Sequence, residues 1–129
     1  MEPGGDRPNR KVYSLTDAGR EELNRWLTTP APLPVVRDPL MVQLFSAEDL
    51  PDAKIVALLR ANRADRERRL ASYQAVAAWL PTVATGKRLK LWLAVVGNGI
   101  SEETAAIAWL DQTIADFSDG DHAAQETAP

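Results

Sequence analysis

Residues 7–27 read RPNRKVYSLTDAGREELNRWL, and they combine a basic turn, a short β-favouring stretch and the start of a helix. Pro8 and Asn9 favour a reversal of the chain. The alternating residues Val12–Leu15 predict a short strand. Thr16 then offers a hydroxyl that caps a helix, whose apolar face is formed by Leu23, Trp26 and Leu27. A basic arm that leads into a packed helix is suited to lie along a nucleic-acid backbone.

Composition limits the classes of protein to which the chain belongs. Its 129 residues are enough for one domain with a modest core, and 45% of them are hydrophobic. The net charge is −3, so any contact with a polyanion must come from a local patch such as Arg7, Arg10 and Lys11. There is no cysteine, which excludes disulfides and thiolate chemistry. No signal region and no apolar run of the ~18–20 residues needed to span a membrane is visible, so we expect a cytoplasmic protein.

A proline-rich segment divides the chain. Three prolines fall within five residues, 30–34, and favour an extended linker over residues 30–37. Asp38 and Pro39 then form a typical helix start, with an N-cap carboxylate followed by proline at the first helical position. A short helix follows, and we expect one face of it to carry Leu40, Met41, Leu44 and Phe45.

The longest predicted helix extends from about Asp52 to Leu80. Its stripe at three- and four-residue steps is apolar at both ends and polar in the middle, at Asn62 and Arg66. We expect the charged run Asp65–Arg69 to form a solvated face with ion pairs along the helix. A helix of this length would extend for ~43 Å, too far to be covered by so small a chain without a partner helix from this chain or a second copy.

A second long helix is predicted from about Lys87 to Phe117. Gly97-Asn98-Gly99 resembles a turn, but the apolar positions on both sides keep the same helical phase, so we expect one helix that is weakened or kinked there. Residues 118–129 show no apolar pattern and are predicted to form a disordered tail. Two long apolar faces predict a two-fold homodimer, with these residues near its centre: Leu70, Tyr73, Ile107, Trp109 and Ile114.

The chain lacks the groups that catalysis needs. Its one histidine, His122, lies in the predicted tail beside Asp119 and Asp121, where nothing fixes a metal-binding geometry. Glu102 and Glu103 are adjacent, so on a helix they diverge by ~100° and cannot act on one atom; surface charge explains them better. We therefore expect no enzyme activity, no metal site and no cofactor.

Two parts of the sequence resemble the PadR family of transcriptional regulators. RPNRK–VYSLT–AGREEL–W is similar to the family's wing and following helix. RDPLMVQLF, the segment ASYQAV and AAIAWLDQTIADF resemble its C-terminal helical domain. The resemblance implies a mainly α fold: a remnant winged-helix wing (one short strand or hairpin) with its helix over residues 1–29, the linker over 30–37, and a long-helix dimerisation domain over 38–117.

The resemblance also implies a truncation. In the family a helix-turn-helix precedes the wing, whereas here only Met1–Asp6 does. We therefore expect a regulator truncated at the N-terminus. Val12–Leu15 would lack a full partner strand, so Met1–Leu15 should be poorly ordered.

The function implied by the resemblance is that of a repressor. In the family the wing contacts DNA, which gives that role to Arg7, Arg10 and Lys11; without a recognition helix, binding to duplex DNA should be weak and without sequence preference. The C-terminal helices swap across a two-fold axis to build the homodimer. Some members bind planar effectors between aromatic side chains, a role open here to Trp92 or Trp109. The alternatives are a helical dimerisation module without DNA binding of its own, and a helical protein that binds a small aromatic effector.

Overall fold

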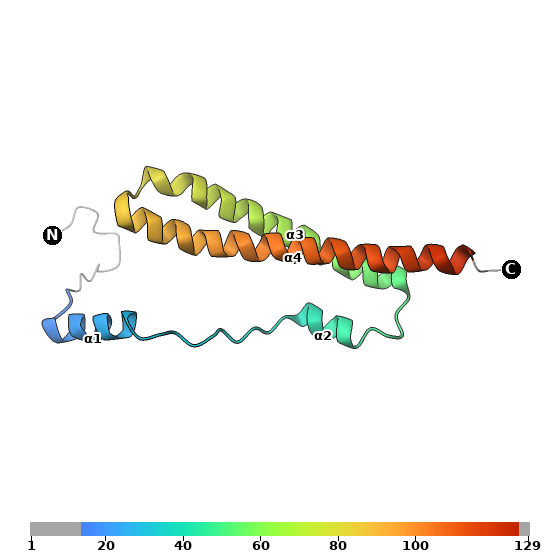
Figure 1. Ribbon diagram of the computed structural model, residues 1–129, viewed down its shortest axis with the longest axis horizontal. Coiled ribbons are helices and arrows are strands. Elements are labelled where there is room, and N and C mark those ends of the chain that lie inside the picture. The colour runs from blue at the N-terminus through green and yellow to red at the C-terminus, as the bar shows by residue number, and fades with distance from the viewer. Residues whose placement is uncertain (1–13, 127–129) are drawn as a thin grey trace, which may run out of the picture. The chain divides into compact units, whose positions relative to one another are not determined.

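The computed structural model describes the backbone of residues 14–126 and the side chains of residues 14–119 (Figure 1). The chain forms two units, Met1–Arg37 and Asp38–Pro129. Helix α1 lies in the first unit, and helices α2, α3 and α4 lie in the second.

Helix α1 covers Asp17–Leu27 and begins as the sequence predicts. The Thr16 hydroxyl accepts a hydrogen bond from the Gly19 amide at 3.0 Å, and Asp17 places a carboxylate in the first turn, where the helix dipole favours negative charge. The apolar residues of the helix are exposed, with Trp26 at 71%. Residues 30–38 then have no regular structure, as the prolines predict.

The predicted strand receives no support from the part of the chain that can be described. Ser14 and Leu15 are irregular, and every regular element within residues 14–126 is a helix. The other half of the predicted strand, Val12 and Tyr13, lies outside the described residues, as does most of the segment Met1–Leu15 that we expected to be poorly ordered. The fold is therefore all-helical as far as it is described.

Helix α2 covers Pro39–Phe45, and its start is also as predicted. Asp38 is the N-cap and Pro39 the first helical residue. Only part of the expected apolar face is buried, however. Leu40 is buried and Leu44 half-buried, but Met41 is 42% exposed and Phe45 is 93% exposed. Phe45 is the last residue of the helix, and its side chain does not reach the core.

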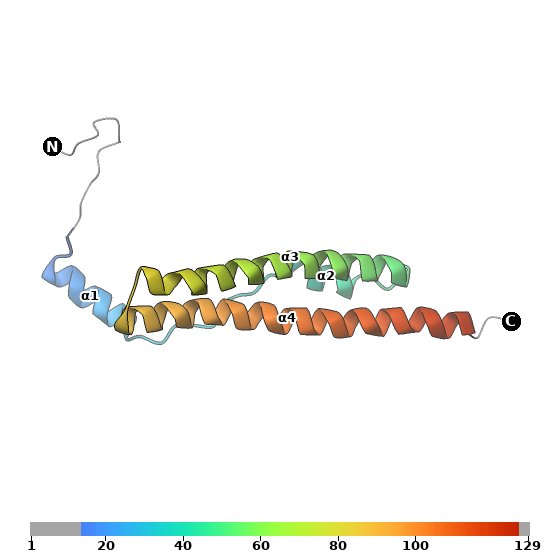
Figure 2. The same cartoon turned by 90° about the horizontal axis from the view of Figure 1, so that it is seen from above.

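Helices α3 (Asp52–Trp79) and α4 (Gly86–Glu126) form an antiparallel hairpin (Figures 1 and 2). Between them is the short 3-10 helix η1, Leu80–Thr82, where Pro81 ends α3. Gly86 then has a φ of +62°, in the left-handed region that glycine adopts at little cost. In both views the C-terminal end of α4 extends past the start of α3, so that part of α4 has no partner helix within the unit.

The last helix is continuous, as predicted, but it is longer than predicted. Helix α4 continues through Gly97–Gly99 without a break, as the constant apolar phase indicated. The tail expected from Ser118 is instead helical as far as Glu126. Residues 118–126 contain no proline and include Ala123, Ala124 and Gln125, which favour a helix even without an apolar stripe.

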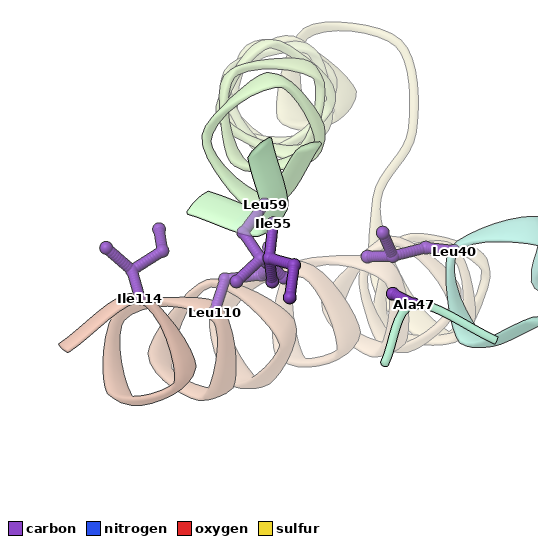
Figure 3. Packing of buried hydrophobic residues seen from close by; sticks show 6 residues of the cluster. All are labelled: Leu40, Ala47, Ile55, Leu59, Leu110 and Ile114. Atoms are coloured by element: carbon purple, nitrogen blue, oxygen red, sulfur yellow. The ribbon is translucent and has the colours of Figure 1, made fainter. Parts of the chain in front are cut away.

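The apolar core lies near the start of α3 (Figure 3). Ile55 and Leu59 of α3 point toward Leu110 and Ile114 of α4, and Leu59 and Leu110 are fully buried. Leu40 and Ala47 join this cluster, so α2 and the turn after it are held on the same core. The core thus fixes the start of α2 and the turn after it against the hairpin, near the start of α3.

Candidate ligand cavity and the polar cluster beside it

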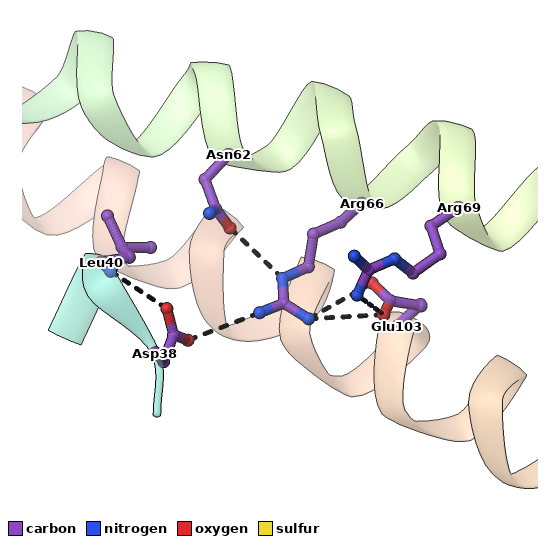
Figure 4. Close-up of polar contacts among 6 residues, drawn as sticks. All are labelled: Asp38, Leu40, Asn62, Arg66, Arg69 and Glu103. Carbon is purple, nitrogen blue, oxygen red and sulfur yellow. Dashed lines mark hydrogen bonds and ion pairs between the residues drawn. The ribbon is translucent and has the colours of Figure 1, made fainter. Parts of the chain in front are cut away.

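A cluster of charged side chains lies midway along the hairpin, where the predicted stripe of α3 changes from apolar to polar (Figure 4). Arg66 of α3 donates hydrogen bonds to the Glu103 carboxylate of α4 at 3.3 and 3.4 Å, and Arg69 donates to the same carboxylate at 3.4 Å. The Glu103 side chain is only 3% exposed. A buried carboxylate needs such partners, because an unpaired charge in a packed interface is costly.

Arg66 has two further partners. Its Nε donates to Asn62 Oδ1 at 3.2 Å, and its Nη2 donates to Asp38 Oδ2 at 3.5 Å. The other oxygen of Asp38 accepts a hydrogen bond from the Leu40 amide at 3.0 Å and so caps α2. One arginine therefore connects the start of α2 to the interface between α3 and α4.

A cavity of about 280 Å³ opens beside this cluster. Asn62 and Arg66 line it from α3, and Asp38 lines it at the start of α2. The remaining lining residues are apolar or aromatic: Leu40, Met41, Ala105, Ala106, Trp109 and Leu110. A mainly apolar wall with a few polar groups at one end is the usual form of a small-molecule site. The guanidinium of Arg66 makes this one suited to an anionic group, and the Trp109 ring suits a planar one.

A second ion pair joins the helices near the core. Arg63 Nε donates to Asp111 Oδ1 at 2.5 Å, and Arg63 also pairs with Glu67 one turn along α3. The hydrogen bond from Arg63 lowers the pKa of the Asp111 carboxyl, and the charges of Arg63 and Arg60 act in the same direction. The pKa of the Arg63 guanidinium is raised in turn, chiefly by its hydrogen bond to Asp111. This pair does not line the cavity.

The structure separates the two tryptophans that were candidates for an effector site. Trp109 lines the cavity and is 41% exposed. Trp92 does not line it; instead the Arg88 guanidinium lies 5.8 Å from the centre of its ring, a cation–π contact at the surface of α4. Of the two, only Trp109 lines a cavity together with polar side chains.

The predicted dimer residues differ in how much surface they leave free. Leu70, Tyr73 and Ile107 are half-buried, and Trp109 is exposed enough to meet a partner. Ile114 is 7% exposed and belongs to the core of its own chain. It therefore has little surface left for a second copy.

Arg66 and Asn62 lie on the inner stripe of α3 as predicted, but the acidic partners of Arg66 were not predicted. Glu103 was interpreted as surface charge, whereas it is buried and shared by two arginines. The run Asp65–Arg69 was interpreted as a solvated face, which holds for Asp65 and Arg68 but not for Arg66. A signal was present, because a charged residue such as Arg66 on a buried stripe needs a partner of opposite charge.

The predicted wing residues Arg7, Arg10 and Lys11 and the single histidine His122 lie outside the residues whose side chains are described. Among those that are described, no group of three or more acidic or histidine side chains is arranged to hold a metal ion. Within the described part of the chain, no helix combines the length and the apolar character that crossing a membrane requires.

Comparison with known proteins gives the family. The family described as Virulence activator alpha C-term matches residues 36–118, which include α2, α3 and most of α4. A probable transcriptional regulator of Mycobacterium tuberculosis is 32% identical over 119 residues, which cover 82% of this chain and 62% of the relative. The negative transcriptional regulator PadR of Bacillus subtilis is 25% identical over 117 residues, covering 86% of this chain and 64% of the relative. The chain belongs to the PadR family of transcriptional regulators.

Solved structures agree on the fold. Bacillus subtilis PadR in complex with operator DNA has a TM-score of 0.72 at 23% identity, covering 86% of this chain and 66% of that one. The same protein in complex with p-coumaric acid has a TM-score of 0.72 at 24% identity, covering 81% and 66%. The chain spans a little under two thirds of the length of the curated PadR-family relatives it matches, 62% and 64%. The family consists of regulators and not of enzymes.

Proposed function

We propose that this PadR-family chain acts in the cytoplasm as a transcriptional repressor, as a homodimer that contacts duplex DNA. The observation that carries the proposal is the family match over residues 36–118, together with the name of the Bacillus subtilis relative, a negative transcriptional regulator. That relative has been solved on operator DNA. In our proposal the α3–α4 hairpin assembles the dimer, and residues 1–29 make the contact with DNA.

Support for the dimer comes from apolar surface that one chain leaves uncovered. Trp109 of α4 is 41% exposed and Val95 is 72% exposed. The end of α4 also extends past α3 without a partner in its own unit (Figure 2). Exposed apolar side chains along a long helix are typical of an interface with a second helix. We propose that Leu70, Tyr73, Ile107 and Trp109 lie at or near this interface.

The DNA contact is tested with charge reversals. We expect the chain to bind duplex DNA weakly, and its affinity to fall steeply with salt because lysine and arginine contacts to phosphates release counterions. Reversing Arg7, Arg10 and Lys11 to Glu should abolish this binding in a fluorescence-anisotropy titration. Reversing Lys54, Arg60 and Arg68 of α3 makes the same change in net charge and serves as the matched control.

Two results would contradict the proposed DNA contact. If both triple variants lose affinity equally, only net charge matters and the wing residues have no special role. If the wing variant binds like the unmodified chain, residues 7–11 do not contact DNA. The alternative, a helical dimerisation module without DNA binding of its own, would be favoured if the unmodified chain bound no DNA.

We also propose that the cavity binds a small planar effector with a carboxylate group. Support comes from the combination of the Trp109 ring and the Arg66 guanidinium in one cavity of about 280 Å³. It comes too from the relative that has been solved with p-coumaric acid. Titration calorimetry with p-coumaric acid should give binding that Trp109→Ala weakens by about tenfold or more, since aromatic contacts dominate such sites. Trp92→Ala is the matched control and should leave the affinity unchanged.

A further inference from the structure

Asp38 performs two tasks with its two oxygens. Oδ1 accepts a hydrogen bond from the Leu40 amide at 3.0 Å, which caps α2. Oδ2 accepts one from Arg66 Nη2 at 3.5 Å, which ties the start of α2 to α3. Figure 4 shows the Arg66 guanidinium reaching between Asp38 on one side and Glu103 on the other. Asp38 is also the first residue of the helical unit, directly after the linker.

The two carboxylates on Arg66 are not equally free to leave. Glu103 is 3% exposed and is held by both Arg66 and Arg69. Removing it from its arginines would leave a buried charge without a partner, which is costly. Asp38 is 23% exposed, and at 3.5 Å its contact with Arg66 is the longest that Arg66 makes. A carboxylate at this position exchanges Arg66 for water at small cost, because partly exposed ion pairs contribute little.

The charges of the cluster set a condition on any anionic ligand. Arg66 and Arg69 are balanced by Asp38 and Glu103. An additional carboxylate that enters the cavity therefore meets a neutral cluster and the like charge of Asp38. It gains a strong pairing with Arg66 only if one of the resident carboxylates leaves. Asp38, which lines the same cavity, is the one that can do so.

We propose that Asp38 is a built-in competitor for Arg66: the carboxylate of an effector in the cavity displaces Asp38 and so releases the start of α2 from α3. This proposal rests on the proposed effector site and adds how occupancy of that site would be transmitted to the start of α2. Once displaced, Asp38 no longer ties the end of the linker to the hairpin. Occupancy of the cavity is thereby coupled to the freedom of the residue at which the N-terminal unit joins the helical unit.

The decisive variant is Asp38→Asn in the full chain. Asparagine is about as good an N-cap as aspartate, so α2 keeps its start while the competing charge is removed. We expect Asp38→Asn to tighten the binding of p-coumaric acid by about two- to fivefold, the loss expected of one partly exposed ion pair. The methyl ester of p-coumaric acid has no carboxylate, and its affinity should not change. Asp111→Asn removes a carboxylate from Arg63, away from the cavity, and should also leave the affinity for the acid unchanged.

A second measurement follows the displacement itself. Saturation of the unmodified chain with p-coumaric acid should speed hydrogen exchange at the Leu40 amide, which otherwise donates a hydrogen bond to Asp38 Oδ1. The amides in the middle of α3 should stay protected. Unchanged exchange at Leu40 would show that the start of α2 is not released, and would overturn the proposal. So would an Asp38→Asn chain that binds the acid no better, or that changes the affinity for acid and ester alike.

An absence of any binding of the acid, in both the unmodified chain and Asp38→Asn, would overturn this inference together with the effector site. The proposed role in transcription would still stand after this result. That role fails separately, if the unmodified chain shows no salt-dependent binding to DNA.

Discussion

The ring of Tyr73 on α3 lies directly against Gly99 on α4, so that a β-carbon built on Gly99 would come 2.9 Å from Tyr73 Cε2. A β-carbon built on Gly97 would meet no atom within 4 Å. Both glycines lie inside α4, where glycine is less favourable than alanine by ~1 kcal/mol. The two positions therefore have the same local cost but different surroundings.

The first prediction compares the two glycines. Gly97→Ala should raise the free energy of unfolding by up to ~1 kcal/mol, because it gains helix propensity and touches nothing. Gly99→Ala should lower it by ~1 kcal/mol or more, because the overlap with the Tyr73 ring exceeds that gain. Urea denaturation of both variants measures the difference. Equal stabilisation by both would mean that the ring moves aside freely and that the helices are not closely packed there.

The second prediction compares the adjacent glutamates. Glu103→Gln should lower the free energy of unfolding by about 1–3 kcal/mol, because Arg66 and Arg69 lose the charge they share. Glu102 is exposed, and Glu102→Gln should change stability by less than about 0.5 kcal/mol. Thermal unfolding at pH 7 separates the two. If Glu103→Gln left the free energy of unfolding unchanged, the buried carboxylate would stabilise the fold no more than a buried amide does.

The third prediction concerns pH. Arg63 holds the pKa of folded Asp111 below its ordinary value of 3.8. As pH falls, the folded state therefore binds fewer protons than the unfolded state. The stabilisation from the Arg63–Asp111 pair is complete above about pH 3.8, the ordinary pKa of the carboxyl, and is lost as pH falls through the lower pKa of the folded state. The unmodified chain should be more stable than Asp111→Asn at pH 7, and this gap should close in acid. Glu102→Gln controls for the loss of one exposed charge. A gap that stays constant down to pH 2 would contradict the assignment.

The helices could be predicted from the sequence because their signals are local. Thr16 and Asp38 are N-cap residues that predict the starts of α1 and α2, and Pro81 predicts the end of α3. The constant apolar phase across Gly97 and Gly99 correctly predicted one helix where turn chemistry suggested two. Packing between α3 and α4 overrides the low helix propensity of the two glycines.

The site was harder to predict because it depends on which residues face each other. Asn62 and Arg66 could be placed on the inner stripe of α3, but the register of α4 against α3 decides that Glu103 meets them. The approach of Asp38 is harder still, since it depends on how α2 folds back onto the core. Nothing in the sequence favours Trp109 over Trp92, and only the cavity distinguishes them.

The last prediction separates the core of one chain from the proposed dimer interface, with neighbouring residues of α4. Leu110 is fully buried within the chain, and Trp109 beside it is 41% exposed. Leu110→Ala should cost about 2–5 kcal/mol of stability, as large-to-small changes in a core do. Trp109→Ala should leave the helix content unchanged and weaken the dimer by about tenfold or more, because exposed aromatic anchors carry much of an interface's energy.

Sedimentation or light scattering across a range of concentrations measures the effect of Trp109→Ala on the dimer. The unmodified chain should have the mass of a dimer at tens of micromolar, and Trp109→Ala should shift toward monomer as it is diluted. Trp92→Ala removes an equally large exposed ring that we do not place at the dimer centre, and its dissociation constant should stay within about threefold of the unmodified value. A monomeric mass for the unmodified chain at these concentrations would contradict the dimer. Equal weakening by both tryptophan variants would instead place the interface along the whole of α4 and not around Trp109.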